Sequence, residues 1–287
     1  MQKNNPSWAF FGTTRFSVIA LEELKAQGFV PKLIITTEDK PKGRNLVLTP
    51  PEVKVWAEKE SIPYIQPSRL KDLEVVEKIK GYALDGFDVF VLFSYGKLIP
   101  QEILSLPKHG ILNIHPSLLP KLRGPSPIKS AILAENETGV TIIKLDEEMD
   151  HGPILAQEKV VIPEWPPYES DLEETLAHVG GKLVARIMQD WIDGKINETP
   201  QDHTEATLCQ KVTKTDGELN MADSADLNLR KIRAFHVWPG AYLFDKGKRI
   251  IIKRAHIEND KLMIDRVTPE GKKEMDYKGY LNGKKSV

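Results

Sequence analysis

The sequence predicts an α/β fold in which an open, mostly parallel sheet is followed by a smaller, mainly β domain. Three observations lead to this prediction. Short apolar runs alternate with segments of helical spacing as far as Gly139. Beyond residue 205, runs that carry Val and Ile follow one another around one short helix. The 287-residue length and the 40% content of hydrophobic residues are sufficient for two domains with cores of ordinary size.

The first half contains an alternation of strands and helices. A strand is expected at residues 8–12, and the helix at 16–27 that follows it ends before Gly28, because glycine is common directly after a helix. Further strands are expected at 32–36, 62–65, 88–93 and 110–115, and further helices at 52–60, 72–80 and 128–134. The runs at 88–93 and 110–115 are mostly apolar, which is typical of strands buried on both faces of a parallel sheet.

The pattern changes after Gly139. Two strands, at 140–145 and 154–162, are separated by an acidic turn, and a long helix is expected at 170–192. The segment that follows is polar and contains one proline. We therefore expect a first domain at 1–196, a linker at 197–204 and a small domain at 205–287, with a helix at 225–235 and strands at 249–255 and 261–267.

Several classes of protein are disfavoured by what the sequence lacks. Cys209 is the only cysteine, so an internal disulfide and a multi-cysteine metal site are excluded. The seven histidines lack the spacing of metal ligands, and the common nucleotide-binding and hydrolase motifs are missing. No apolar run reaches the length of a membrane span, and residues 1–7 are too polar for a signal peptide. We therefore expect a cytoplasmic protein without a metal.

Charge is distributed unevenly between the two predicted domains. Residues 1–204 carry 23 basic and 29 acidic side chains, whereas residues 205–287 carry 17 basic and 12 acidic ones. A basic domain joined to an acidic one indicates a polyanionic partner for the basic part. The alternative is that the lysines serve only solubility.

Two polar residues end a strand that is otherwise apolar. Asn113 and His115 are two positions apart on the predicted strand at 110–115, so their side chains point to the same face. Open α/β sheets place their ligands at the carboxyl ends of such strands. The alternative is a structural histidine that is hydrogen-bonded in the core. Two buried polar side chains on one face both need partners, which favours a functional site.

A carboxylate completes this candidate site. Asp150 lies in the acidic turn 146–152, and it could orient the His115 ring and stabilise the charged form of that ring. The alternative is a solvated charged hairpin without a function. The loop between His115 and Arg123 is rich in proline, and its apolar tip could form one wall of a site for a flat ligand.

Together, these motifs resemble the folate-dependent formyltransferase family. The resemblance rests on Asn113-Ile114-His115, Arg123-Gly124, Asp150-His151-Gly152, the Ser117–Pro120 loop and the Thr138–Thr141 segment, and it begins at Phe11-Gly12-Thr13 and covers nearly the whole chain. It implies a Rossmann-like first domain, an OB-like barrel as the second domain, and 10-formyltetrahydrofolate as the formyl donor. The implied acceptor is the α-amino group of methionine on initiator tRNA, and we expect a monomer.

The resemblance also implies roles for particular residues. It assigns the catalytic roles to Asn113, His115 and Asp150, in which the asparagine and histidine donate to the oxyanion and the aspartate relays the amine proton. The residues implied in folate binding are Ser117, Leu118, Leu119, Pro120, Phe93, Tyr95, Gly96 and Leu98. The residues implied in tRNA binding are Lys40, Lys42 and Arg44 in the loop at 38–49.

Some positions depart from the family pattern. His151 stands where the family usually has Thr, Pro116 is typical of relatives that formylate glycinamide ribonucleotide, and Leu46 and Val47 replace basic residues. The segment at 257–273 is also short. A sugar-nucleotide N-formyltransferase or another folate-dependent formyltransferase is therefore the first alternative, and a non-catalytic folate- or RNA-binding module is the second. The basic second domain favours tRNA, because phosphate contacts need cations.

Overall fold

The computed structural model describes residues 5–43 and 46–283. The chain divides into two compact units. The first, which we call the sheet unit, comprises residues 1–123, 139–160 and 174–207. The second, the C-terminal unit, comprises residues 124–138, 161–173 and 208–287. The C-terminal unit thus includes two stretches that precede residue 197, and the domain bounds predicted from the sequence stay a prediction.

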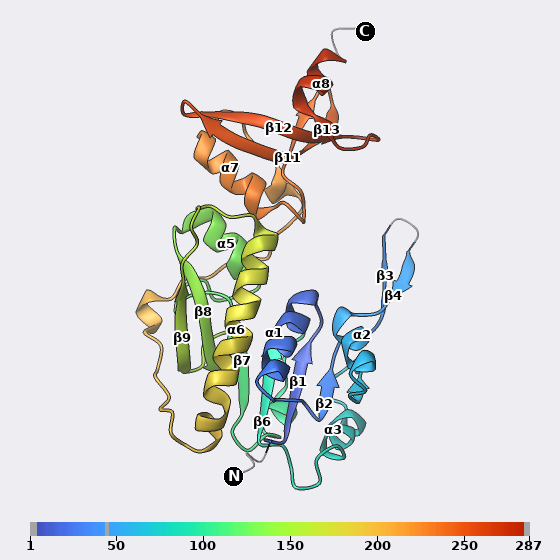
Figure 1. Cartoon of the computed structure of the whole chain (residues 1–287), viewed down its shortest axis with the longest axis vertical. Coiled ribbons are helices and arrows are strands. Elements are labelled where there is room, and N and C mark those ends of the chain that lie inside the picture. The colour runs from blue at the N-terminus through green and yellow to red at the C-terminus, as the bar shows by residue number, and fades with distance from the viewer. Residues whose placement is uncertain (1–4, 44–45, 284–287) are drawn as a thin grey trace. The chain divides into compact units, whose positions relative to one another are not determined.

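The sheet unit is organised around one seven-stranded sheet. Its order is β5 (Tyr64–Ile65), β2 (Leu33–Ile35), β1 (Trp8–Gly12), β6 (Val89–Phe93), β7 (Ile111–His115), β8 (Thr138–Lys144) and β9 (Ile154–Val160) (Figure 1). The strands from β5 to β7 are parallel, and β8 runs antiparallel to β7. The mostly parallel sheet that the sequence predicts is therefore confirmed.

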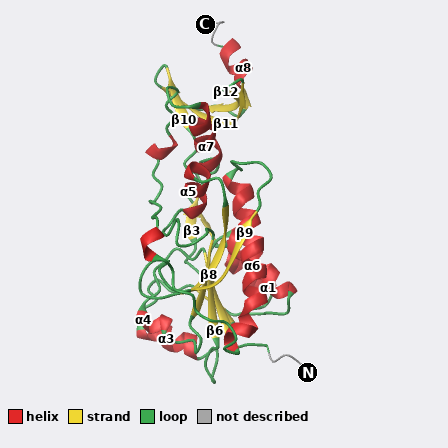
Figure 2. Cartoon of the chain, turned by 90° about the vertical axis from the view of Figure 1, so that its left-hand side faces the viewer, coloured by secondary structure: helices red, strands yellow, loops and turns green. Residues whose placement is uncertain are grey.

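Helices cover both faces of this sheet. Figure 2 shows α1 and α6 on one side of the strands and α3 and α4 on the other. The helices of this unit are α1 (Arg15–Ala26), α2 (Glu52–Lys59), α3 (Leu73–Lys80), α4 (Gln101–Leu104) and most of α6 (Glu169–Ile192). No helix of the described residues is long and apolar enough to cross a membrane.

Two glycines let α6 lie close to its neighbours. A Cβ atom on Gly180 would come within 2.5 Å of the Ile114 side chain of β7, and one on Gly181 would come within 2.8 Å of the Ala20 carbonyl of α1. Such distances are far below an ordinary van der Waals contact, so any larger residue here would push α6 away from β7. The small residues therefore hold the strand that carries Asn113 and His115 in place.

A hairpin projects from the sheet unit where the sequence predicts a basic loop. It consists of β3 (Lys40–Lys42) and β4 (Val47–Thr49), which pair antiparallel (Figure 1). The first two residues of β4 are exposed although they are apolar, with Val47 61% and Leu48 64% exposed. Arg44 lies outside the described residues.

The C-terminal unit contains a second sheet with all strands antiparallel. Its order is β10 (Tyr242–Asp245), β11 (Lys248–Glu258), β12 (Lys261–Pro269) and β13 (Met275–Asp276). The turn between β11 and β12 is Asn259-Asp260, and both residues have positive φ, as a tight hairpin turn requires. The mainly β second domain is confirmed. Its described sheet has four strands, whereas the OB fold has five.

Three helices accompany this second sheet: α5 (Pro127–Ala134), α7 (Ala225–Ala234) and α8 (Tyr277–Asn282). Ser224 caps α7 by accepting a hydrogen bond from the Leu227 backbone N–H at 3.1 Å. The guanidinium of Arg230 on α7 donates to the carbonyls of Ile132 and Glu135 at 3.0 and 2.7 Å. These carbonyls lie at the end of α5 and have no partner within the helix, so Arg230 joins the two helices by capping one of them.

An acidic pair in the C-terminal unit, the buried Glu169 and the half-buried Glu173, makes the stability of the protein depend on pH. Burial and the neighbouring Glu169 carboxylate raise the pKa of Glu173 from the ordinary 4.5 to about 7, against the opposing effect of Lys129. The folded chain therefore holds the Glu173 proton more tightly than the unfolded chain does. Protonated Glu173 contributes to the free energy of unfolding below pH 4.5, and this contribution is lost as the pH rises through about 7.

Glu173→Gln should consequently stabilise the protein at neutral pH. The quantity of interest is the free energy of unfolding of the variant minus that of the wild type. We expect this difference to be about 1–3 kcal/mol larger at about pH 8 than at about pH 4, because one pKa unit corresponds to about 1.4 kcal/mol. Denaturant unfolding of both proteins across this pH range measures the difference. A difference that stays constant with pH would contradict the assignment.

Candidate active site

The central strand β7 brings the two predicted polar residues to one face. Asn113 pairs with Leu92 of β6 and with Ile143 of β8, and His115 pairs with Thr141 of β8. Both side chains are buried, with Asn113 6% and His115 3% exposed. They lie at the carboxyl end of a strand between two others, which is where open α/β sheets bind ligands.

A tight turn between β8 and β9 carries Asp150. Its backbone is left-handed with φ +52°, a conformation that few residues other than glycine adopt. A Cβ atom on Gly152 would lie 1.9 Å from the Lys144 carbonyl oxygen, so only glycine fits this close approach. The turn is thus folded back tightly against the end of β8.

This turn places the Asp150 carboxylate against both residues of β7. The amide of Asn113 donates to Asp150 Oδ1 at 3.3 Å, and His115 Nδ1 lies 3.4 Å from the same oxygen. The Asp150 side chain is 12% exposed. The structure therefore brings together the three side chains that the sequence analysis singles out, in a site where most water is excluded.

The hydrogen bonds of His115 define where its proton lies. Nε2 is 3.0 Å from the Leu122 carbonyl oxygen, which can only accept, so Nε2 carries a hydrogen. The other ring nitrogen, Nδ1, faces the Asp150 carboxylate at 3.4 Å. The ring is therefore held between a backbone carbonyl and a carboxylate at the end of β7.

The predicted folate loop is tied to β8 by one hydroxyl group. Thr141 Oγ1 donates to the Ser117 carbonyl at 2.7 Å and accepts from the Leu119 backbone N–H at 3.1 Å. Gln157 on β9 donates to the Leu119 carbonyl at 2.8 Å and to Thr141 at 2.9 Å. Leu118 and Pro120 are half-buried, whereas Ser117 and Leu119 are buried. The loop is thus rigid and directly follows His115.

The other predicted folate segment follows the neighbouring strand β6. Residues shortly after β1 hold this segment in place through hydrogen bonds. Ser17 donates to the Phe93 carbonyl at 2.7 Å, and Thr13 donates to the Tyr95 carbonyl at 3.0 Å. The side chains of Phe93 and Tyr95 are buried at 4% and 2% exposure. A ligand therefore meets the backbone of this segment and its exposed residues Gly96 and Leu98 rather than these two rings.

Two of the three predicted tRNA contacts, Lys40 and Lys42, lie on β3, and the third, Arg44, is outside the described residues. Lys40 and Lys42 are exposed, and Lys42 pairs with Glu52 at 3.1 Å between two solvated side chains. Such exposed pairs contribute little to stability, so both ammonium groups can turn to another partner. Leu46 stands next to the part of the hairpin that is not described, and it is 71% exposed.

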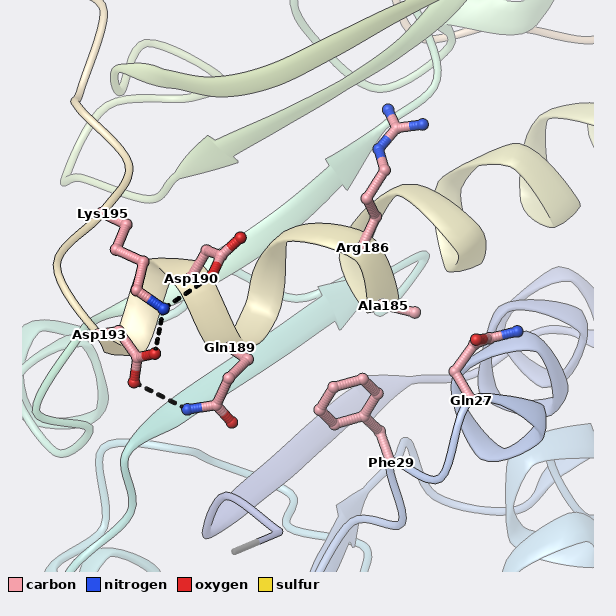
Figure 3. A pocket seen from close by; sticks show the side chains of 8 residues that line it. All are labelled: Gln27, Phe29, Ala185, Arg186, Gln189, Asp190, Asp193 and Lys195. Atoms are coloured by element: carbon pink, nitrogen blue, oxygen red, sulfur yellow. Dashed lines mark hydrogen bonds and ion pairs between the residues drawn. The ribbon is translucent and has the colours of Figure 1, made fainter. Parts of the chain in front are cut away.

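One surface cavity of about 450 Å³ lies away from these residues. It is lined by Gln27, Phe29, Ala185, Arg186, Gln189, Asp190, Asp193 and Lys195 (Figure 3). Its charged groups already have ion-pair partners, since Lys195 contacts Asp190 and Asp193 at 3.2 and 2.7 Å and Arg186 contacts Glu158 of β9 at 2.9 Å. The cavity therefore offers no reactive group. Among the described residues, no cluster of three or more His, Cys, Asp or Glu side chains could hold a metal ion.

Comparisons with known proteins point to one family. Residues 8–188 match the family model described as formyl transferase, and residues 211–262 match the formyl transferase C-terminal domain. The methionyl-tRNA formyltransferase of Chloroflexus aurantiacus is 41% identical over 86% of this chain and 79% of its own. That of Thermus thermophilus is 37% identical over 92% of this chain and 85% of its own.

The solved structures agree with this at the level of the fold. The N-formyltransferase of Helicobacter canadensis, in complex with folinic acid and dTDP-3-aminofucose, superposes with a TM-score of 0.65 at 18% sequence identity. The match covers 94% of this chain and 98% of that one. At this level of identity the likeness shows a shared fold and does not carry the sugar substrate over.

Proposed function

The chain belongs to the formyl transferase family, and we propose that it transfers a formyl group from 10-formyltetrahydrofolate to the α-amino group of methionine on initiator methionyl-tRNA. The observation that carries this proposal is the set of three buried polar side chains at the end of β7, with Asp150 Oδ1 3.3 Å from Asn113 and 3.4 Å from His115. Relatives named methionyl-tRNA formyltransferase at 37–41% identity support the choice of acceptor.

The residues around this set fit a folate. Gly96 has a φ of +80° and open space around its Cα, so a flat ring can approach the backbone there. Leu98 is 82% exposed and offers an apolar surface. Bound there, 10-formyltetrahydrofolate supplies a formyl group attached to nitrogen.

Each of the three side chains has a separate task in this proposal. A primary amide has two N–H bonds, so Asn113 can donate one to Asp150 and the other to the formyl oxygen, where negative charge develops as the amine attacks. Asp150 accepts the proton that the attacking amine loses and passes it to N10 of the folate as the formyl C–N10 bond breaks, so that tetrahydrofolate leaves neutral at that nitrogen. From the sequence, His115 is expected to donate to the oxyanion, but its Nε2 faces the Leu122 carbonyl and its Nδ1 faces Asp150, so its task in this proposal is to orient the Asp150 carboxylate.

The test is a choice between acceptors. The purified protein is incubated with labelled 10-formyltetrahydrofolate and either methionyl initiator tRNA or an amino-sugar nucleotide. We expect formyl transfer to the tRNA only. Transfer to the sugar nucleotide alone would establish the sugar-nucleotide N-formyltransferase instead, and binding of folate without any transfer would establish the non-catalytic module.

The proposed tRNA contacts on the hairpin allow a separate prediction. Arg44→Ala should lower kcat/KM for the tRNA, and the ratio to the wild type should correspond to a loss of about 1–3 kcal/mol of transition-state stabilisation. The reason is that a planar guanidinium binds phosphate through two hydrogen bonds. The KM for 10-formyltetrahydrofolate should stay unchanged. Arg69→Ala, at an exposed arginine of the sheet unit, is the control and should affect neither constant. An equal loss for both substrates would show that the hairpin does not read the tRNA.

A further inference from the structure

A polar segment that the sequence analysis interprets as a linker contacts the backbone on both sides of the candidate active site. Thr199 forms two hydrogen bonds with Ile154 of β9, at 2.8 and 2.9 Å. From there the chain runs past the Asp150 turn and then beside the loop that contains Leu122. We call residues 199–207 the strap. All of these residues belong to the sheet unit.

The buried amide of Gln201 clamps the Asp150 turn. Its Nε2 donates to the Asp150 carbonyl at 2.8 Å and to the Gly152 carbonyl at 2.7 Å. Its Oε1 accepts two hydrogen bonds from the guanidinium of Arg123, at 3.0 and 2.6 Å. Gln201 is 5% and Arg123 7% exposed. Arg123 thus fixes the orientation of an amide whose two N–H bonds both serve the turn.

The far end of the strap holds the acceptor of His115. Thr207 Oγ1 accepts a hydrogen bond from the Leu122 backbone N–H at 2.8 Å, and the Leu122 carbonyl accepts from His115 Nε2 at 3.0 Å. Leu122 has a φ of +62° and Asp150 a φ of +52°. Two non-glycine residues in this disfavoured conformation persist only where their surroundings hold them, and here the strap contacts each one.

We infer that Gln201 is a positioning residue for formyl transfer, and that the strap sets the geometry between Asp150 and His115 from both sides. The inference rests on the proposed function of the three side chains. Gln201 acts through the backbone of Asp150 and does not contact either substrate. Its loss should therefore lower kcat while leaving both KM values nearly unchanged, because only the alignment of the reacting groups is disturbed.

The chain offers a closely matched pair of variants. In Gln201→Glu the new carboxylate still accepts from Arg123 but cannot donate to the two carbonyls, so only the contact with the turn is broken. The control is Asn228→Asp in the C-terminal unit. Asn228 is 1% exposed and also donates its amide to a backbone carbonyl, that of Asn220, at 2.9 Å. The control thus destabilises the fold in the same way without affecting Asp150.

The experiment measures formylation kinetics and hydrogen–deuterium exchange on the full chain. We expect kcat of Gln201→Glu to fall about 10- to 100-fold with each KM within about twofold, and exchange at residues 146–153 to become faster. In Asn228→Asp we expect normal kcat and normal exchange in that segment, even where its melting temperature falls equally. Normal kcat and exchange in Gln201→Glu, or equal loss of kcat in the control, would overturn the inference.

A double-mutant cycle separates the clamp from general packing. Arg123 reaches the turn through Gln201 and also through His203, which lies 2.9 Å from the guanidinium and stacks on His151. The cycle is therefore measured in a His203→Ala background, where Arg123→Leu should lower kcat but not lower it further when Gln201→Leu is also present. Additive losses would show that the two side chains act independently. An inactive wild type would refute the proposed function and not the clamp, because the exchange rates of residues 146–153 still test the contact of Gln201 with the turn.

Discussion

Asp150→Asn is expected to lower kcat for formyl transfer by about 10²- to 10⁴-fold, the range that general acid–base catalysis contributes. The asparagine keeps the shape of the side chain and tolerates the left-handed backbone at φ +52°. The hydrogen bonds from Gln201 go to backbone carbonyls and stay intact. What is lost is the negative charge that takes the amine proton and faces His115 Nδ1. Single-turnover formylation at saturating substrates measures the loss.

The control for this prediction lies on the same turn. Asp146 accepts from the Glu148 backbone N–H at 3.0 Å and pairs with His151 Nδ1 at 2.7 Å, and it does not contact Asn113 or His115 in the described hydrogen bonds. Asp146→Asn removes a charge of the same sign from the same seven-residue segment and should leave kcat within about threefold of the wild type. Equal rates in both variants, or a fast Asp150→Asn, would remove Asp150 from the proposed chemistry.

The part of this site that could be predicted from sequence is the part that follows from strand geometry. The apolar run at 110–115 indicates a buried strand, and alternation along a strand places Asn113 and His115 on the same face whatever the rest of the fold. The contact with Asp150 was proposed from the chemistry of the three residue types. It depends on a tight turn, and the glycine at 152 is the only local signal for the close approach to Lys144.

Other features have no local signal. β3 contains Lys-Pro-Lys and lacks the apolar alternation that predicts a strand. The hairpin therefore cannot be predicted from this sequence, and it is identified only from the pairing of β3 with β4 in the structure. Gln201 lies in a stretch that is polar throughout, and its partners Asp150 and Arg123 are 51 and 78 positions away. A polar segment looks the same in a sequence whether it is solvated or buried against a site. Neither Pro200 nor Gln201 indicates in the sequence whether this segment is solvated or buried.

The second large effect is expected at Asn113. Asn113→Ala should lower kcat by about 10²- to 10³-fold, the usual loss when one hydrogen-bond donor to a developing oxyanion is removed. The loss should appear in kcat more than in either KM, because the donor is needed most when charge develops on the formyl oxygen. Gln157→Ala tests an exposed residue whose amide holds the neighbouring loop through Leu119 and Thr141, and it should change the KM for folate more than kcat.

Asn113→Asp distinguishes an electrostatic role of this residue from a packing role. Aspartate has nearly the shape of asparagine, so a residue that only fills space would leave kcat of Asn113→Asp near normal. In the proposed mechanism the new carboxylate places negative charge beside Asp150 and beside the formyl oxygen, and it donates no hydrogen bond. At about pH 8 this variant should therefore be at least as slow as Asn113→Ala.

Acidification should then separate the two variants. Two carboxylates this close cannot both stay ionised easily, so the site of Asn113→Asp binds a proton more readily than a lone aspartate does, and the introduced carboxyl group regains one donor once it is protonated. The ratio of kcat for Asn113→Asp to kcat for Asn113→Ala should rise as the pH falls from about 8 to about 6. Taking the ratio cancels the protonation of the substrate amine, which affects both variants equally. A ratio above one at pH 8 that does not change with pH would mean that Asn113 fills space and donates nothing.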